Sequence, residues 1–94
     1  MPIDPRPLVY RVHAVQRMVE RGIYEEDVAF VVETGKKIED YPNDLPYPSC
    51  LKVGWVGSRP IHVVTAATDR EIIVVTVYEP DPERWEPGFE KRKL

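Results

Sequence analysis

Two groups of basic and polar side chains have the types needed to handle a phosphate ester without a metal ion. The residues are His13, Arg17 and Arg21 near the start of the chain, and Arg59, His62 and Tyr78 in its second half. Histidine and tyrosine can transfer protons, and an arginine can hold a phosphate through two hydrogen bonds. RNA cleavage without a metal needs a base, an acid, and cations for the charge that builds on phosphorus. If the fold brings the two groups together, they form such a site.

The first group also has an ordinary structural interpretation. His13 and Arg17 are four residues apart, so they share one face of a helix. That face could simply be solvated, with Glu20 as the ion-pair partner of Arg17, and such exposed pairs contribute little to stability. Both interpretations stay open at this stage.

The second group has structural alternatives as well. Arg59 precedes Pro60 and could be a turn residue with a loose surface salt bridge, or a clamp for a ligand. His62 lies in an apolar run and could be a hydrogen-bonded core histidine. Tyr78 lies near the end of an apolar run, and its role could simply be to seal a sheet edge. Our candidate assignment is catalytic His13, His62 and Tyr78, with Arg17 and Arg59 binding phosphate.

The remaining motifs exclude most common enzyme classes. The chain has no nucleotide-binding glycine loop, no paired-cysteine metal motif and no nucleophile elbow. A single cysteine, Cys50, cannot form an internal disulfide. One cysteine and two histidines also provide few ligands for a zinc site. We therefore expect no metal and no cofactor, and interpret Cys50 as a small buried apolar residue.

Length and composition indicate one ordinary globular domain. The 94 residues are 43% hydrophobic and 31% charged, and no apolar run approaches the roughly 20 residues that span a bilayer. The first residues contain no apolar stretch typical of a signal peptide. We expect a cytoplasmic protein of one domain, residues 1–94, with an extended lead over 1–9 and a partly ordered tail over 81–94. The sequence gives no signal for an oligomeric state.

The charge of the chain argues against a protein that coats nucleic acid. The net charge is −3, and nonspecific affinity grows with the number of phosphates neutralised, so any contact with RNA must be local. Residues 1–24 carry four arginines and two acids, whereas residues 25–48 carry seven acids and two lysines. The acidic stretch supports a second hypothesis, a noncatalytic module that docks a basic protein on residues 33–44.

The first half of the chain has helical periodicity. From Val12 to Glu20, apolar residues fall on one side and the basic and polar residues on the other, and Gly22 ends this helix. A second helix begins after Tyr24 with three acids in its first turn and ends at Gly35. Because the link between the two helices is so short, we expect them to pack antiparallel.

After Gly35 the pattern alternates, which indicates strands over 36–41, 51–56, 60–67 and 71–78. Residues 8–10 either add a short strand or only lead into the first helix. The expected fold is α+β: an N-terminal antiparallel helix pair on one face of a three- to four-stranded antiparallel sheet. Tyr78 is assigned to the open face of that sheet. Trp85 and Phe89 are expected to anchor a short tail helix.

Four strings of residues resemble a known bacterial family. They are HAVQRMVERGI at 13–23, IEDYP at 38–42, RPIHVV at 59–64 and TVYEPD at 76–81. Together they are similar to the domain of unknown function 4258, over nearly the whole chain. That family looks like a distant relative of the RelE and BrnT toxins of toxin–antitoxin pairs, which implies a RelE-like fold.

The resemblance also implies a function. It implies a toxin-like, metal-independent endoribonuclease that acts on mRNA, with an antitoxin as protein partner, such as a zinc-ribbon protein of the MqsA kind. The chain departs from the family pattern at Tyr24, where a small capping residue is usual, and in being acidic.

Overall fold

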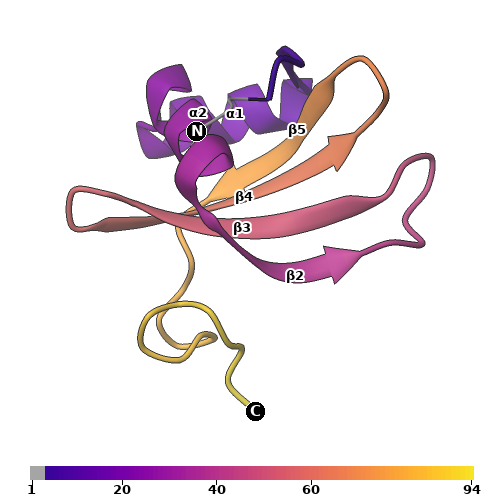
Figure 1. The fold of residues 1–94 in the computed structure, drawn as a ribbon. Helices are drawn as coiled ribbons and strands as arrows, with labels where there is room; N and C mark the ends of the chain where they lie inside the picture. The colour runs from indigo at the N-terminus through magenta and orange to yellow at the C-terminus, as the bar shows by residue number, and fades with distance from the viewer. Residues whose placement is uncertain (1–3) are drawn as a thin grey trace.

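The computed structural model describes residues 4–94, so the first three residues of the expected extended lead lie outside the described part. Two helices and five strands follow one another along the chain. They are β1 (Leu8–Tyr10), α1 (Val12–Arg21), α2 (Glu25–Thr34), β2 (Lys36–Tyr41), β3 (Ser49–Val56), β4 (Arg59–Ala67) and β5 (Ile72–Tyr78). The helices lie on one side of the sheet, and the C-terminal segment, residues 81–94, lies on the other (Figure 1).

The strands form one mixed sheet in the order β1-β5-β4-β3-β2. Strands β2 to β5 pair antiparallel with their neighbours, whereas β1 runs parallel to β5, with Leu8 opposite Ile72 and Tyr10 opposite Val74. The prediction of a three- to four-stranded antiparallel, RelE-like sheet is therefore wrong. Three residues are too few to show an alternating pattern, and parallel pairing across more than 60 positions leaves no local signal.

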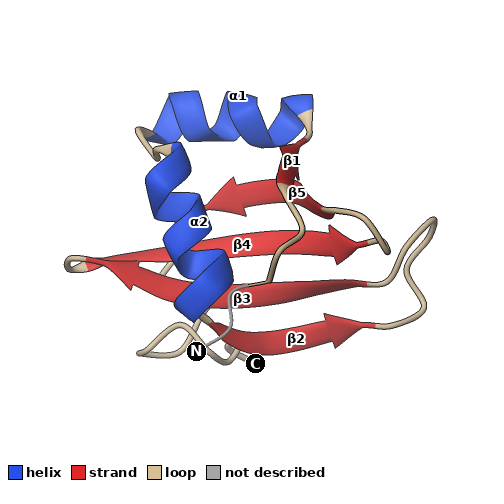
Figure 2. Cartoon of the chain, turned by 45° about the horizontal axis from the view of Figure 1, so that its top comes forward, coloured by secondary structure: helices blue, strands red, loops and turns tan. Residues whose placement is uncertain are grey.

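The two helices do not form an antiparallel pair, which corrects the second part of that prediction. Helix α1 makes its main contacts with β5, and α2 crosses β3 and β4 (Figure 2). Gly22 ends α1 in the left-handed conformation, φ 63°, as expected. The chain then turns so that each helix buries its apolar side chains against its own strands.

Helix α1 buries only part of the apolar side that its periodicity predicts. Ala14 and Met18 are buried, whereas Val12 and Val19 are 74% and 78% exposed and Val15 is also exposed. The helix stands at the edge of the sheet beside β5, so only a narrow strip of small and flexible side chains meets the core. Its basic side is thereby turned toward the end of β5.

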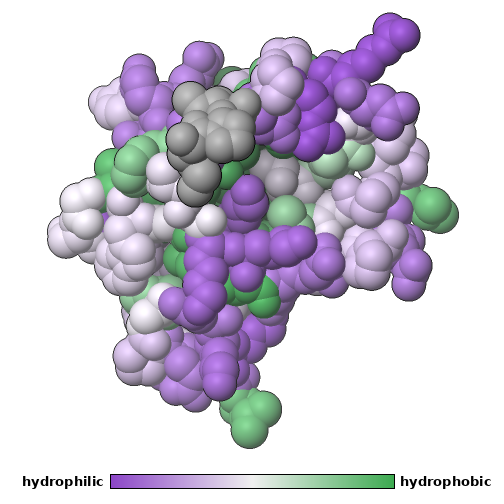
Figure 3. All heavy atoms as spheres, viewed as in Figure 1, coloured by the Kyte–Doolittle hydropathy of each residue, from purple (hydrophilic) through white to green (hydrophobic). Residues whose placement is uncertain are grey.

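The core on the helix side of the sheet joins residues of both helices to alternate residues of the strands. Its fully buried or nearly buried members are Ala14, Met18, Ile23, Val28, Val31, Val32, Ile61, Val63, Ile72, Val74 and Val77. The valines of α2 lie in this core, as the helical spacing predicts. The surface seen in Figure 3 is mostly polar, and apolar groups appear on it only in separate patches.

The C-terminal segment covers part of the opposite face. Trp85 is 4% exposed, and its backbone pairs with that of Arg92 in an isolated bridge. Phe89 meets Trp55 of β3 edge-on, with ring centroids 5.9 Å apart. Lys36 of β2 holds Glu90 in an ion pair of 2.7 Å. The segment is thus packed against β2 and β3 on this face, and it is folded as turns and a bridge rather than as the expected short helix.

Gly54 on β3 sets how closely α2 approaches the sheet. A Cβ at this position would lie 2.8 Å from Cγ2 of Val31, closer than packed carbon atoms approach. We predict that Gly54→Ala lowers the free energy of unfolding by about 1–3 kcal/mol through overpacking. Chemical denaturation of the variant and of the wild type measures this loss.

The matched test is a double-mutant cycle with Val31→Ala. Because the shortened side chain leaves room at position 54, Gly54→Ala should cost less in that background than in the wild type. Equal losses in the two backgrounds would contradict the contact as the cause.

Candidate functional site

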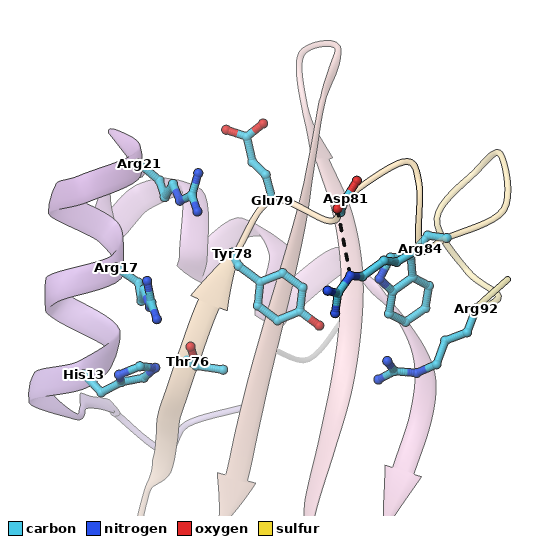
Figure 4. Close-up of a pocket in the computed structure, with 10 residues that line it drawn as sticks. His13, Arg17, Arg21, Thr76, Tyr78, Glu79, Asp81, Arg84 and Arg92 are labelled. Carbon is cyan, nitrogen blue, oxygen red and sulfur yellow. Dashed lines mark ion pairs between the residues drawn. The ribbon is translucent and has the colours of Figure 1, made fainter.

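A hollow of about 440 Å³ lies between α1, the end of β5 and the C-terminal segment. Volumes of this size are typical of small-molecule sites. Figure 4 shows side chains converging on it from the three elements. The lining residues are His13, Arg17, Arg21, Thr76, Tyr78, Glu79, Asp81, Arg84, Trp85 and Arg92.

The wall from α1 consists of His13, Arg17 and Arg21. Their spacing of four places them on one side of the helix, and that side faces the hollow because α1 stands beside β5. Arg17 also makes an ion pair of 3.4 Å with Glu20, and both side chains are about half exposed. Such a pair contributes at most about 1 kcal/mol, so Arg17 can exchange it for a phosphate.

The floor is the last part of β5. Thr76 and Tyr78 are two residues apart and so point to the same face of the sheet, which is the face that the helices leave open. This confirms the side of the sheet predicted for Tyr78. In Figure 4 the phenol oxygen of Tyr78 points away from α1 and toward the C-terminal segment. Burial raises the pKa of Tyr78, so its hydroxyl keeps its proton at neutral pH.

The third wall carries Arg84 and Arg92. Asp81 lies 4.0 Å from Arg84 and also accepts the Glu83 N–H at 2.9 Å, which shapes the turn that begins the segment. Arg92 binds the Glu39 carboxylate of β2 through two hydrogen bonds of 2.8 and 3.0 Å. This guanidinium lowers the pKa of Glu39.

Arg92 is also held by an aromatic ring. Its guanidinium lies 4.7 Å from the centroid of the Trp85 ring, in a cation–π contact. Arg92 therefore both fastens the segment to β2 and places a cation at the hollow.

His62 lies behind Tyr78, in the interior. It is fully buried, with Nδ1 3.3 Å from the Tyr78 hydroxyl and Nε2 2.9 Å from the Phe89 carbonyl oxygen. Trp85 packs edge-on against its ring at 4.5 Å between centroids. Desolvation lowers the pKa of His62, and the Phe89 carbonyl and the Glu39 charge offset part of this effect. His62 thus has the position of a hydrogen-bonded core histidine that touches a residue of the hollow.

Arg59 holds the end of α1 rather than lining the hollow. Its guanidinium binds the backbone carbonyls of Arg21 and Gly22, the latter at 3.0 Å. It also forms an ion pair of 2.6 Å with Glu79. Cations at a helix C-terminus satisfy carbonyls that have no partner within the helix. Arg59 therefore positions Arg21 and Glu79, both of which line the hollow.

The structure brings three of the five candidate residues together and separates two. His13, Arg17 and Tyr78 line the hollow, whereas His62 lies behind it and Arg59 beside it. The sequence reasoning did not name Arg84 and Arg92, and it named Arg21 in the first group without assigning it a role. Arg21 continues the four-residue spacing of His13 and Arg17 and could have been assigned from it. The two tail arginines gave one indirect signal, the aromatic residues Trp85 and Phe89 that anchor the segment.

A search against protein-family models matches residues 10–79 to the family described as domain of unknown function (DUF4258). The chain belongs to this family. No curated protein and no solved structure matches it. Because the match ends at Glu79, the C-terminal segment with its two arginines lies outside the part that the family model covers.

Neither described helix has the length and apolar character that a membrane crossing requires. Within residues 4–94, no three histidine, cysteine or acidic side chains gather as ligands for a metal ion.

The buried His62 predicts that stability depends on pH. Its folded pKa lies below the ordinary value of 6.5, so the unfolded chain binds the proton more readily. The free energy of unfolding should therefore be unaffected by this group above pH 6.5 and should fall as the pH drops below it. Denaturation at pH 7.5 and pH 5.5 measures the loss.

His62→Gln is expected to reduce this pH dependence, because glutamine does not titrate. The control is His13→Gln, which removes the other histidine of the chain, an exposed one, and should leave the dependence in place. An equal loss of stability at low pH in wild type and His62→Gln would contradict His62 as the cause.

Proposed function

We propose that this protein is a toxin-like, metal-independent endoribonuclease. The observation that carries the proposal is the hollow itself, in which His13 and Tyr78 lie among arginines from two different walls. Proton-transfer groups with guanidinium groups around them are the combination that phosphodiester cleavage needs in the absence of a metal.

The arginines of the hollow come from two walls, one formed by α1 and the other by the C-terminal segment. Arg17 and Arg21 reach in from α1, and Arg84 reaches in from the C-terminal segment (Figure 4). A phosphate between them would be held from both sides by charge-assisted hydrogen bonds. His13 and Tyr78 come from different elements, so one can act on the attacking 2′-hydroxyl and the other on the leaving 5′-oxygen.

The acidic character of the chain is compatible with a local site. The net charge of −3 is the sum over the whole chain, whereas four guanidinium groups line one hollow. Affinity for RNA depends on the phosphates that are contacted, so a site that holds only a short stretch of chain needs few cations. We expect a short single-stranded segment of mRNA as substrate.

The toxin part of the proposal follows the resemblance to the RelE and BrnT toxins. It implies action in the cytoplasm and an antitoxin as protein partner. Overexpression in a bacterial host should then inhibit growth, and coexpression of the antitoxin should relieve the inhibition.

The alternative, a noncatalytic protein-binding module that uses residues 33–44, has less support. Glu39 is bound by Arg92, Asp40 lies 3.9 Å from Lys37, and Asp44 accepts the Ser49 hydroxyl at 2.6 Å. Three of the four acids in that stretch are thus already paired within the chain. Charge reversal at Asp40, the most weakly held of them, would reduce the capture of a basic partner if this alternative were correct.

We predict that the pure protein cleaves a mixed single-stranded RNA in the presence of EDTA. The fragments should carry 5′-hydroxyl ends and 2′,3′-cyclic or 3′-phosphate ends, because the 2′-oxygen is the expected nucleophile. His13→Gln should slow cleavage by about 100-fold or more, as expected for loss of a proton-transfer group. Arg17→Gln should chiefly weaken binding of RNA.

The matched control is Arg70→Gln, because Arg70 is exposed on the turn between β4 and β5, away from the hollow. Cleavage by this variant should equal that of the wild type. If His13→Gln were as active as Arg70→Gln, or if EDTA abolished cleavage, the proposal would fail.

A further inference from the structure

Among residues 4–94, His62 is the one buried titratable side chain that contacts a residue of the hollow without lining it. Its two ring nitrogens have different partners, the Tyr78 hydroxyl at Nδ1 and the Phe89 carbonyl at Nε2. These partners together define the direction of both hydrogen bonds. That direction decides whether the Tyr78 hydroxyl donates a hydrogen bond to a molecule in the hollow or accepts one from it.

The Phe89 carbonyl fixes the tautomer. A carbonyl oxygen can only accept, so Nε2 of His62 must carry the proton of the bond at 2.9 Å. Burial keeps the imidazole neutral at neutral pH, which leaves Nδ1 without a proton. The Tyr78 hydroxyl must then donate to Nδ1, and the lone pairs of its oxygen are left to accept a hydrogen bond from the hollow.

We propose that Tyr78 and His62 form a proton relay that acts as the base, with its direction set by the C-terminal segment. This inference rests on the function proposed above and assigns the roles that the hollow alone leaves open. Tyr78 touches the substrate. His62 acts only through Tyr78 and is a positioning residue and proton acceptor. His13 is then the acid.

The protons balance in a single displacement. The 2′-hydroxyl gives its proton to the Tyr78 oxygen while the Tyr78 proton moves to Nδ1 of His62, which becomes an imidazolium. The 2′-oxygen forms a bond to phosphorus, and the bond from phosphorus to the 5′-oxygen breaks. His13, in its imidazolium form, gives its proton to that oxygen. The products are a 2′,3′-cyclic phosphate and a 5′-hydroxyl.

The surroundings of His62 can accept the charge that the relay creates. The group facing it from β2 is the Glu39 carboxylate, and those facing it from the C-terminal segment are the Phe89 carbonyl and the Arg92 guanidinium. From β5 it meets only the neutral phenol of Tyr78. The carboxylate and the carbonyl favour the imidazolium, and Arg92 opposes it while remaining bound to Glu39. Tyr78 never has to become a phenolate, so its raised pKa is no obstacle.

The decisive variant is His62→Gln. A glutamine amide can accept from Tyr78 through its oxygen and donate to the Phe89 carbonyl through its nitrogen, but it has no basic nitrogen. We expect cleavage to fall by about 100-fold, with thermal stability at pH 7.5 and affinity for RNA close to those of the wild type. Tyr78→Phe should lose as much, and the double variant should lose little more, because the two residues act as a unit.

Nitrogen-15 NMR of the full chain tests the relay without any RNA. At pH 7.5, His62 should show a protonated Nε2 and an unprotonated Nδ1, and Tyr78→Phe should shift the Nδ1 resonance. Arg92→Gln, which releases the segment from Glu39, should bring the ring toward a mixture of tautomers. Arg70→Gln is the control and should leave the spectrum unchanged.

Two results would overturn the relay: a proton on Nδ1 of His62 at pH 7.5, or a His62→Gln variant that cleaves within about threefold of the wild type. If the wild type cleaved no RNA, the nuclease function and the transfer step would both fail. The NMR spectrum would still support or overturn the direction of the Tyr78 to His62 bond.

Discussion

Trp85 packs edge-on against the His62 ring, with 4.5 Å between the centroids, and this contact holds the C-terminal segment on the face that the helices leave uncovered. Without the segment, His62 would lie on an open sheet surface and would lose the acceptor for its Nε2. The same segment supplies Arg84 and Arg92 to the hollow. One aromatic contact thus links the burial of His62 to the formation of a third wall.

The wall formed by α1 depends on the short length of β1. This strand pairs with only the first three residues of β5, so within the described chain the rest of that edge has no strand beside it. Helix α1 occupies the vacant edge and makes its main contacts there. Because it packs on the helix side of the sheet over the edge strand β5, its basic side reaches past that edge to the hollow. Its exposed valines are the consequence of the same placement.

Much of the local structure could be predicted from the sequence, because it depends on neighbours in the chain. The helical spacing of Val28, Val31 and Val32 and the glycine stop at Gly22 were sufficient signals for their elements. The parallel pairing of β1 and the angle between the helices could not be predicted, since they depend on contacts between distant segments. His13 and Arg17 were found from their spacing on one helix. Arg84 and Arg92 come from a segment that has no regular period.

His62 and Arg59 show a second limit of sequence reasoning. Both are residue types that occur in catalytic or phosphate-binding sites, and both lie close to the hollow. Each nevertheless forms hydrogen bonds to backbone carbonyls of the protein. Residue type identifies what a side chain can do, but burial and partners decide what it faces. In the proposed relay His62 keeps a role, through the hydroxyl of Tyr78, whereas Arg59 contributes by holding the end of α1.

The ion pairs around the hollow explain how an acidic protein could still bind a phosphate there. Arg17 and Arg84 have carboxylate neighbours at 3.4 and 4.0 Å, in exposed positions where such pairs are weak. A bound phosphate can replace them at little cost, and it meets the Arg21 guanidinium, which makes no ion pair within residues 4–94. Arg92 differs, since two hydrogen bonds and the Trp85 ring keep it in place. The hollow therefore combines cations that can be released to a ligand with one that holds the wall itself.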